Sequence, residues 1–489
     1  FNSKAELFNN KAYYKRNSVS ARAFLNLGTV NKDALLYGLN LTVNLGADFT
    51  DYARTTVNDK YHGNAADQGG SLYKTNTRSF SYTLNELLTY RRKFGEHSID
   101  ILAGHEYYRY NYNYVMAGKS GIVDGIDELG AAVTTIANTS YSNDYAIESV
   151  LARLNYGYAD RYYFDVSWRT DGSSRFHKDH RWGNFWSVGA SWRISQEAFM
   201  EPASSWLSNL TVRASYGVQG NDNLGSYYAW QGRFNYGWSN GTRPGAMAGS
   251  IENRLVTWEK NGNLNIGVDA TFLKGRLSAI VEYYNRKTWD MLLNNPLAIS
   301  SGFSGYDDNV GSMLNQGMEF TLRAVIFEKP NFHWDATAML SFNRNKVLSL
   351  TSGQDVLNYG SMVIEVGKPI YTFYLSKSAG VSPATGKQLY YCYYRYAVDE
   401  KGAMVTERCP EYVTDDVSLA TMSKYYYGSR QPLFSGSIAS NFTIFKDFDL
   451  SFLTTYSLGG RIMDGLYDSA MHVTYPGNNW HRNILRRWQ

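Results

Sequence analysis

The sequence predicts an all-β protein, a transmembrane antiparallel β-barrel, on three observations. Apolar and polar residues alternate strictly in one segment after another, as at 39–46, where every second residue is leucine or valine. Such segments are about 9 to 11 residues long, the length of a strand that crosses a bilayer. Aromatic residues make up 16% of the chain. Many, including Tyr107, Tyr108, Tyr227 and Tyr228, are expected at strand ends in an interfacial belt.

The alternating segments follow one another along almost the whole chain, in the order 39–46, 150–156, 162–168, 188–194, 210–216, 264–272, 277–283, 318–324, 334–342 and 450–458. Two tight turns are expected, one at 158–161 and one around Lys274, Gly275 and Arg276. The stretch 50–75 is expected to be a long polar loop. Short turns at one rim and long loops at the other are typical of outer-membrane barrels, and roughly 14 to 16 strands are expected.

The composition fits a barrel and excludes several other classes. A run of 18 or more apolar residues, which a membrane helix would need, does not occur in the sequence. The mean hydropathy of -0.41 would suit a soluble protein, but in a barrel only every second residue faces lipid. The 48 basic and 44 acidic residues are interspersed, which argues against a nucleic-acid partner. From composition alone, a soluble β-sandwich, β-helix or propeller remains the alternative.

Five long stretches lack the alternation and are expected to be irregular loops that carry binding or gating: 116–144, 220–257, 294–314, 350–388 and 395–431. In the second of them, Trp230, Phe234, Tyr236 and Trp238 form an aromatic cluster. We expect these four residues to contact the substrate or a partner, with packing inside the loop as the alternative.

A second aromatic group surrounds Cys392, and its rings stack on sugars, contact a partner, or end a strand in the interfacial belt. It comprises Tyr390, Tyr391, Tyr393, Tyr394 and Tyr396. Cys392 and Cys409 are the only cysteines. They form one loop disulfide or remain two free thiols, and the sequence leaves both possibilities open.

Catalytic and metal-binding motifs are missing from the sequence. His177 and His180 have a spacing that suits a metal, but a third ligand is not visible nearby, so a solvated loop is the expected interpretation. P-loop, GxSxG and HExxH motifs do not occur. We therefore expect neither an enzyme, nor a metal site, nor a cofactor.

Four motifs, in the same order along the chain, closely resemble the SusC/RagA-type TonB-dependent transporters of the bacterial outer membrane. They lie at 169–200, 210–231, 258–293 and 309–320. The first motif contains Asp171 to Arg175, which are expected to be loop residues. In the last two motifs, Trp258, Glu259 and Gly317 are expected at strand starts. All of these residues are expected to be architectural.

The resemblance implies a barrel of about 22 strands with a plug in its lumen. By this resemblance, we expect the plug and the TonB-contacting segment to lie outside residues 1–489, and the closing strands to lie beyond 478–489. We therefore expect residues 1–489 to be one barrel domain that is incomplete at both ends.

The function implied by the resemblance is active import of oligosaccharides or oligopeptides across the outer membrane. Its expected partners are a SusD-like lipoprotein that caps the extracellular mouth, the TonB–ExbB–ExbD system acting through the missing N-terminal part, and outer-membrane lipid. The alternatives are a passive pore or a surface adhesion receptor. A barrel enzyme is a third possibility, but it would need a catalytic set at the rim.

Overall fold

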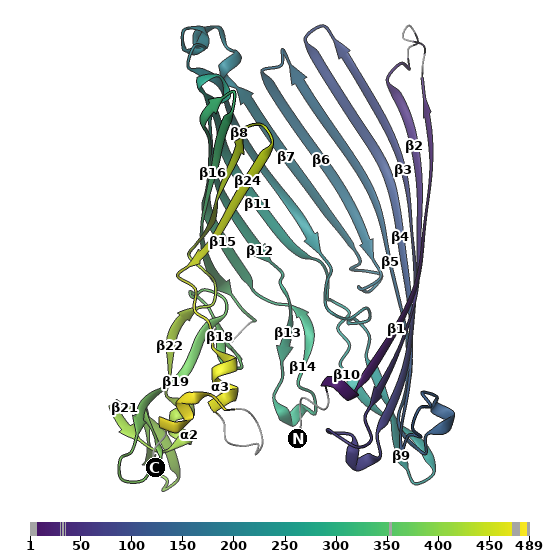
Figure 1. Ribbon diagram of the computed structural model, residues 1–489, viewed down its shortest axis with the longest axis vertical. Helices are drawn as coiled ribbons and strands as arrows, with labels where there is room; N and C mark the ends of the chain where they lie inside the picture. The colour runs from purple at the N-terminus through teal and green to yellow at the C-terminus, as the bar shows by residue number, and fades with distance from the viewer. Residues whose placement is uncertain are drawn as a thin grey trace. The chain divides into compact units, whose positions relative to one another are not determined.

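The computed structural model describes residues 7–29, 31, 34, 36–351, 355–471 and 480–486, and strands dominate them (Figure 1). Contacts divide the chain into two compact units. Unit 1 comprises Phe1–Arg193, Arg213–Gly262 and Asp290–Asn309, and unit 2 comprises Ile194–Val212, Asn263–Trp289 and Val310–Gln489. The predicted all-β class is confirmed. In the described part of the chain, no helix is long and apolar enough to cross a membrane.

Unit 1 contains seven strands that pair antiparallel in chain order: β1 (Lys11–Gly28), β2 (Leu39–Asn58), β3 (Ser71–Phe94), β4 (His97–Ser120), β5 (Thr134–Tyr158), β6 (Tyr162–Ser173) and β7 (Trp182–Arg193). They run side by side in Figure 1. Two strands, β8 (Leu207–Asn221) and β11 (Glu259–Phe272), contribute residues to both units. Two hairpins complete unit 1: β9 (Arg233–Asn240) with β10 (Arg243–Ser250), and β13 (Leu292–Pro296) with β14 (Gly305–Asn309).

The register gives the sheet of unit 1 two unlike faces. Ile101, Leu154 and Val166 stand opposite one another on β4, β5 and β6, and all three are exposed in this chain. The next row, on the other face, includes Ser167, whose hydroxyl lies 2.6 Å from that of Ser187. We call these the apolar face and the polar face of unit 1. Exposed apolar rows are what a lipid-facing surface requires.

Both predicted tight turns are confirmed. Ala159 and Asp160, between β5 and β6, have φ of 52° and 53°. Two consecutive left-handed residues are the mark of a type I′ turn, whose twist matches that of the flanking strands. Between β11 and β12 (Leu277–Trp289), Leu273, Lys274 and Gly275 likewise have positive φ.

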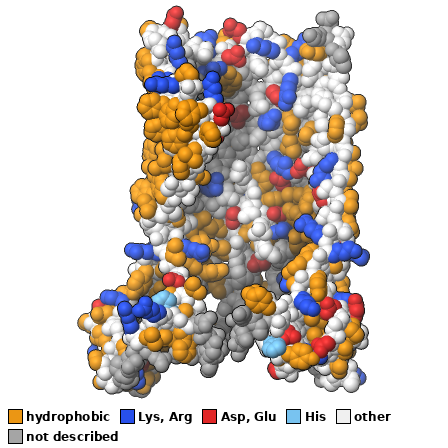
Figure 2. Space-filling view, viewed as in Figure 1, with side chains coloured by type: hydrophobic (Ala, Val, Ile, Leu, Met, Phe, Trp, Pro, Cys, Tyr) orange, Lys and Arg blue, Asp and Glu red, His pale blue; other side chains and the backbone are white. Residues whose placement is uncertain are grey.

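Unit 2 contains five long strands that pair in the order β12 (Leu277–Trp289), β15 (Ser312–Lys329), β16 (Phe332–Ser349), β23 (Phe434–Ile444) and β24 (Phe448–Leu458). Val281, Phe320 and Leu340 form an exposed apolar row. Trp334 and Phe442 stack at 5.5 Å between ring centroids. Hydrophobic side chains accordingly gather over this region at the upper left of Figure 2.

Residues 355–431, between β16 and β23, form a folded unit that we call the inserted module. It contains β17 (Val356–Tyr359), β18 (Met362–Glu365), β19 (Thr372–Val381), β20 (Gln388–Val398), β21 (Met404–Thr414) and β22 (Lys424–Ser429), which form a six-stranded sheet, and the helix α2 (Val417–Met422). Cys392, Leu419 and Ala420 form its buried core. A second helix, α3 (Gly465–Met471), follows β24.

The prediction of long irregular loops is wrong in most places. The ranges 350–388 and 395–431 largely belong to the inserted module, 116–144 is strand except at 121–133, and 233–250 is a hairpin. The expected loop at 50–75 shrinks to 59–70. The long strands continue past their apolar segments, where both faces are polar and alternation vanishes although the backbone stays paired. The 24 strands of the described chain therefore exceed the expected number, and 14 of them are ordered in the main sheet.

Candidate functional site

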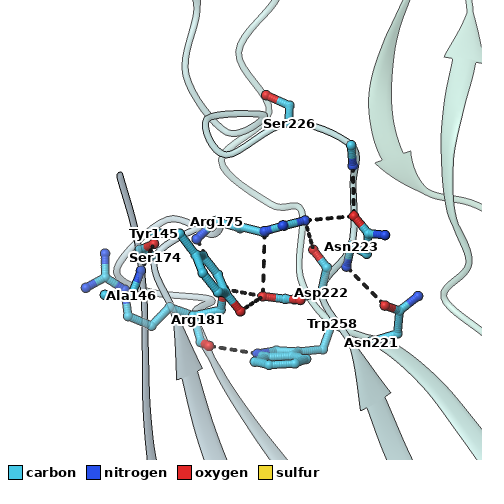
Figure 3. Close-up of polar contacts among 12 residues, drawn as sticks. Tyr145, Ala146, Ser174, Arg175, Arg181, Asn221, Asp222, Asn223, Ser226 and Trp258 are labelled. Carbon is cyan, nitrogen blue, oxygen red and sulfur yellow. Dashed lines mark hydrogen bonds and ion pairs between the residues drawn. The ribbon is translucent and has the colours of Figure 1, made fainter. Parts of the chain in front are cut away.

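A polar cluster of unit 1 brings together residues of β5, of the end of β6 and of the segment after β8. Figure 3 shows Tyr145, Arg175 and Asp222 of this cluster. The carboxylate of Asp222 accepts hydrogen bonds from the hydroxyls of Tyr145, at 2.8 Å, and Ser173, at 2.7 Å. The Nε atom of Arg175 lies 3.9 Å from the same carboxylate, and both side chains are largely buried. We call this cluster the Arg175–Asp222 node.

Arg175 ties the loop after β8 to the strands. Its Nη1 donates to the Asp222 carbonyl at 3.3 Å and to Asn223 Oδ1 at 3.0 Å. Its guanidinium carbon also lies 4.9 Å from the ring centroids of both Tyr145 and Tyr227. A cation over aromatic faces is attracted to them. The node therefore fixes the loop and occupies the faces of two tyrosines.

A compact core supports the node. Phe176, fully buried, packs 5.5 Å from Trp258 between ring centroids, and Phe185 packs 5.3 Å from the same indole. The Nε1 of Trp258 donates to the carbonyl of Arg181 at 2.7 Å, as Figure 3 shows. Gly220 has to be glycine because a Cβ there would lie 2.1 Å from the Phe185 ring. These buried rings hold in place the segments that follow β6 and β8, which have little regular structure.

The motif residues 171–173 are not loop residues as expected, because β6 extends to Ser173 and all three are buried. Nearby on the same strand, Arg169 donates to Asp171 at 2.6 Å, to Glu106 at 2.9 Å and to Ser149 at 2.8 Å. The motif therefore encodes partly buried hydrogen bonds within β6 and between strands, which the spacing of polar residues in the sequence did not reveal.

A group of tyrosines lies beside the node on the polar face. It contains Tyr108, Tyr110, Tyr112 and Tyr114 of β4 and Tyr141 and Tyr145 of β5, and we call it the tyrosine wall. Neighbouring rings lie 4.9 to 6.4 Å apart between centroids, and Tyr227 of the loop contacts both Tyr110 and Tyr145. Sequence reasoning missed this group, although tyrosine at every second position of 108–114 was the available signal.

The strand register corrects the prediction that adjacent tyrosines lie together in an interfacial belt. Tyr107 and Tyr108 point to opposite faces of β4, so Tyr107 contacts Tyr82 at 5.8 Å while Tyr108 contacts Tyr145 at 6.0 Å. Tyr227 and Tyr228 lie in the loop after β8 and not at a strand end. Adjacent residues of a strand cannot share one face, so a Tyr–Tyr pair at a strand end does not place both rings in a belt.

The four aromatic residues expected to bind do not form one cluster. Trp230 packs edge-on against His177 at 5.2 Å. Phe234, Tyr236 and Trp238 lie on β9 and are 59%, 80% and 55% exposed, with no ring contact among them in the described chain. Their role in binding remains a prediction. His177 is largely buried and is not solvated as expected. The described residues contain no group that could hold a metal ion.

In the inserted module, cations cover tyrosine faces. Lys377 Nζ lies 4.3 Å from the ring centroid of Tyr391 and 5.1 Å from that of Tyr425. Arg408 lies 5.2 Å from Tyr393. Cys392 and Cys409 are free thiols in this structure, and burial raises the pKa of Cys392.

Unit 2 has a polar cavity of about 470 Å³ on the face opposite its apolar row. Its lining includes Tyr284, Glu319 and Asn343. Tyr284 lies across Gly317 and donates to Asn343 at 2.9 Å. A Cβ at Gly317 would meet the Phe342 carbonyl at 2.0 Å, so this glycine permits close approach of the ring and the neighbouring strand.

Comparisons with known proteins agree on one family. Residues 2–462 match the family model described as TonB dependent receptor-like, beta-barrel. The chain is 27% identical over 467 residues to the TonB-dependent receptor SusC of Bacteroides thetaiotaomicron, which covers 91% of this chain and 44% of SusC. It is 33% identical over 292 residues to a TonB-dependent receptor of Formosa agariphila, which covers 58% of this chain and 29% of that protein.

Solved structures give the same fold. The RagAB peptide transporter superposes with a TM-score of 0.82 at 26% identity over 98% of this chain and 52% of that chain. The RagAB peptide importer in its closed-closed state gives a TM-score of 0.78 at 27% identity over 92% of this chain and 48% of that chain. The chain spans less than half the length of the curated relatives named above.

Proposed function

Because the chain belongs to the TonB-dependent receptor β-barrel family, we propose that it forms the barrel wall of an active nutrient importer in the bacterial outer membrane. The cargo would be an oligosaccharide or an oligopeptide, and the energy would come through TonB, ExbB and ExbD. The observation that carries this proposal is the family match over 2–462, which covers most of each unit. The two-faced sheets support it, since their exposed apolar rows suit lipid.

We propose further that a SusD-like lipoprotein caps the extracellular mouth of the barrel. Two features of the described chain support such a partner. The β9–β10 hairpin presents the exposed rings of Phe234, Tyr236 and Trp238. The tip of the β20–β21 hairpin presents Val398 and Met404, which are 71% and 76% exposed. Exposed apolar side chains on loops are typical of contact surfaces.

Purification of the full-length parent from outer membranes tests the proposal. We expect a lipoprotein to copurify and mass spectrometry to find a bound glycan or peptide. Uptake of that molecule by cells should require both the transporter gene and an intact TonB system. Uptake that persists without TonB would support a passive pore instead, and a ligand-free barrel that mediates attachment to surfaces would support an adhesion receptor.

A further inference from the structure

The register defines regular neighbours for the four tyrosines that β4 contributes to the tyrosine wall. On the polar face, the four tyrosines of β4 stand between residues of β3 and β5. Their β3 partners all carry hydroxyl groups and are Thr83, Ser81, Ser79 and Thr77, in the order of Tyr108 to Tyr114. Their β5 partners are Ile147, Tyr145, Asn143 and Tyr141. These twelve positions carry no formal charge.

Charged side chains near the wall are engaged with other groups. Glu106, two positions before Tyr108 on the same face of β4, pairs with Arg169 at 2.9 Å, and Arg54 of β2 lies 5.5 Å from the ring centroid of Tyr14. Arg175 lies over Tyr145 and Tyr227 and beside the carboxylate of Asp222. On the neighbouring strands, Arg22 and Asp48 pair with each other at 3.0 Å. A ligand with charged ends would therefore lose water at the wall without gaining a partner of opposite charge, and this desolvation is costly.

The rings themselves are spaced for an elongated ligand. Successive tyrosines on one face of a strand follow at about 7 Å, and the rings of Tyr110 and Tyr112 lie 6.4 Å apart with an interplanar angle of 19°. The four β4 tyrosines are partly exposed, and Tyr141 is 49% exposed. A chain that lies along β4 would meet one ring after another, with the hydroxyls of β3 beside it.

We propose that the tyrosine wall is a subsite for the sugar rings of a neutral oligosaccharide. The apolar faces of sugar rings pack on aromatic rings, while their hydroxyls exchange hydrogen bonds with serine, threonine, asparagine and tyrosine side chains. The inference rests on the proposed import function and names the class of its cargo. A peptide also packs on aromatic rings, but its terminal ammonium and carboxylate find no free counter-charge at this wall.

The test uses the full-length transporter purified in detergent. The probes are a panel of linear neutral oligosaccharides of six sugar units and a panel of peptides of similar length, measured by calorimetry. We expect an oligosaccharide to bind, and Tyr110→Ala with Tyr112→Ala to weaken it roughly tenfold or more. Tyr110→Phe with Tyr112→Phe keeps the rings and should retain most of the affinity. Tyr107→Ala is the matched control, because this tyrosine lies next to Tyr108 on the other face.

If the double alanine variant does not fold, nitration of tyrosines in the unaltered protein replaces it, and the bound oligosaccharide should protect wall tyrosines and leave Tyr107 reactive. Three results would overturn the subsite: binding of peptides but of no neutral oligosaccharide, oligosaccharide binding that survives both alanines, or no protection. TonB-dependent uptake of another nutrient would then leave the import function standing. Wall-dependent oligosaccharide binding without uptake would instead refute the import function alone.

Discussion

The tyrosine wall and the inserted module both concentrate tyrosines, but they treat the ring faces differently. On the wall, the rings of Tyr110 and Tyr112 contact other tyrosines, and the guanidinium of Arg175 sits over Tyr145 and Tyr227. In the module, Lys377 lies between Tyr391 and Tyr425. Density of tyrosine in a sequence therefore says little about binding, because the position of the nearest cation decides which faces are open.

This difference changes the interpretation of the tyrosines around Cys392. Tyr391 and Tyr393 have cations over their faces, and Tyr390 and Tyr394 pack against the module core. A strand end in an interfacial belt does not describe β20 either, because β20 pairs only with β19 and β21 of the module. We infer that most of these rings stabilise the module.

The largest expected effect follows from Asp222→Ala, which breaks the node beside the wall. The substitution removes the acceptor of the Tyr145 and Ser173 hydroxyls and the counter-charge of Arg175. We expect the loop after β8 to lose roughly 3 kcal/mol of stability against local opening. Hydrogen exchange of the full-length protein at 221–232 measures this loss.

The control is Asp222→Asn, which keeps an oxygen acceptor and should cost clearly less. The two substitutions at Asp222 also test the comparison between the tyrosine wall and the inserted module. Without its counter-charge, Arg175 is free to move over the open rings of Tyr110 and Tyr112, and oligosaccharide binding should then fall as well. Equal protection of 221–232 in both variants and the unaltered protein would show that the node does not hold the loop.

The long strands could be predicted from sequence because a half-buried strand repeats every two residues, as in 264–272 and 334–342. The tight turn at 158–161 was also predictable, because only a few residues separate the two alternating segments that it joins. The family could be recognised from motifs such as 169–200, which contains Ser173 and Arg175 of the node. Local patterns therefore predicted most of the long strands.

The tyrosine wall and the inserted module were missed for physical reasons. The wall arises from pairing between β3, β4 and β5, in which residues 25 to 39 positions apart become neighbours. The module consists of short strands around a small core, so it lacks a sustained period-two pattern. Which aromatic faces are open depends on contacts such as Lys377 with Tyr425, and spacing along the chain does not encode them.

A smaller effect is expected from Lys377→Met, which uncovers two rings of the module. The lysine contributes cation–π contacts to Tyr391 and Tyr425 and an ion pair with Glu411 at 3.4 Å. We expect a loss of about 1 kcal/mol, since the lysine is partly exposed. Hydrogen exchange at 388–414 provides the measurement. Lys387→Met is the matched control, because Lys387 pairs with Asp415 without covering a ring, and its loss should be close to zero.

The smallest expected effect is a pH dependence of the stability of the inserted module. It arises from Glu411, which lies beside the same lysine. The hydroxyl of Tyr425, which donates to this carboxylate at 2.7 Å, and the charge of Lys377 hold the pKa of Glu411 below its ordinary value of about 4.5. The ionised carboxylate therefore favours the folded module. This contribution is complete above the ordinary pKa and is lost as the pH falls through the lower folded-state pKa. Relative to Glu411→Gln, the unaltered protein should show greater exchange protection at 388–414 at pH 7, and the difference should vanish in acid. A difference that persists unchanged into strong acid would mean that the carboxylate charge is not what couples β21 to the covered rings.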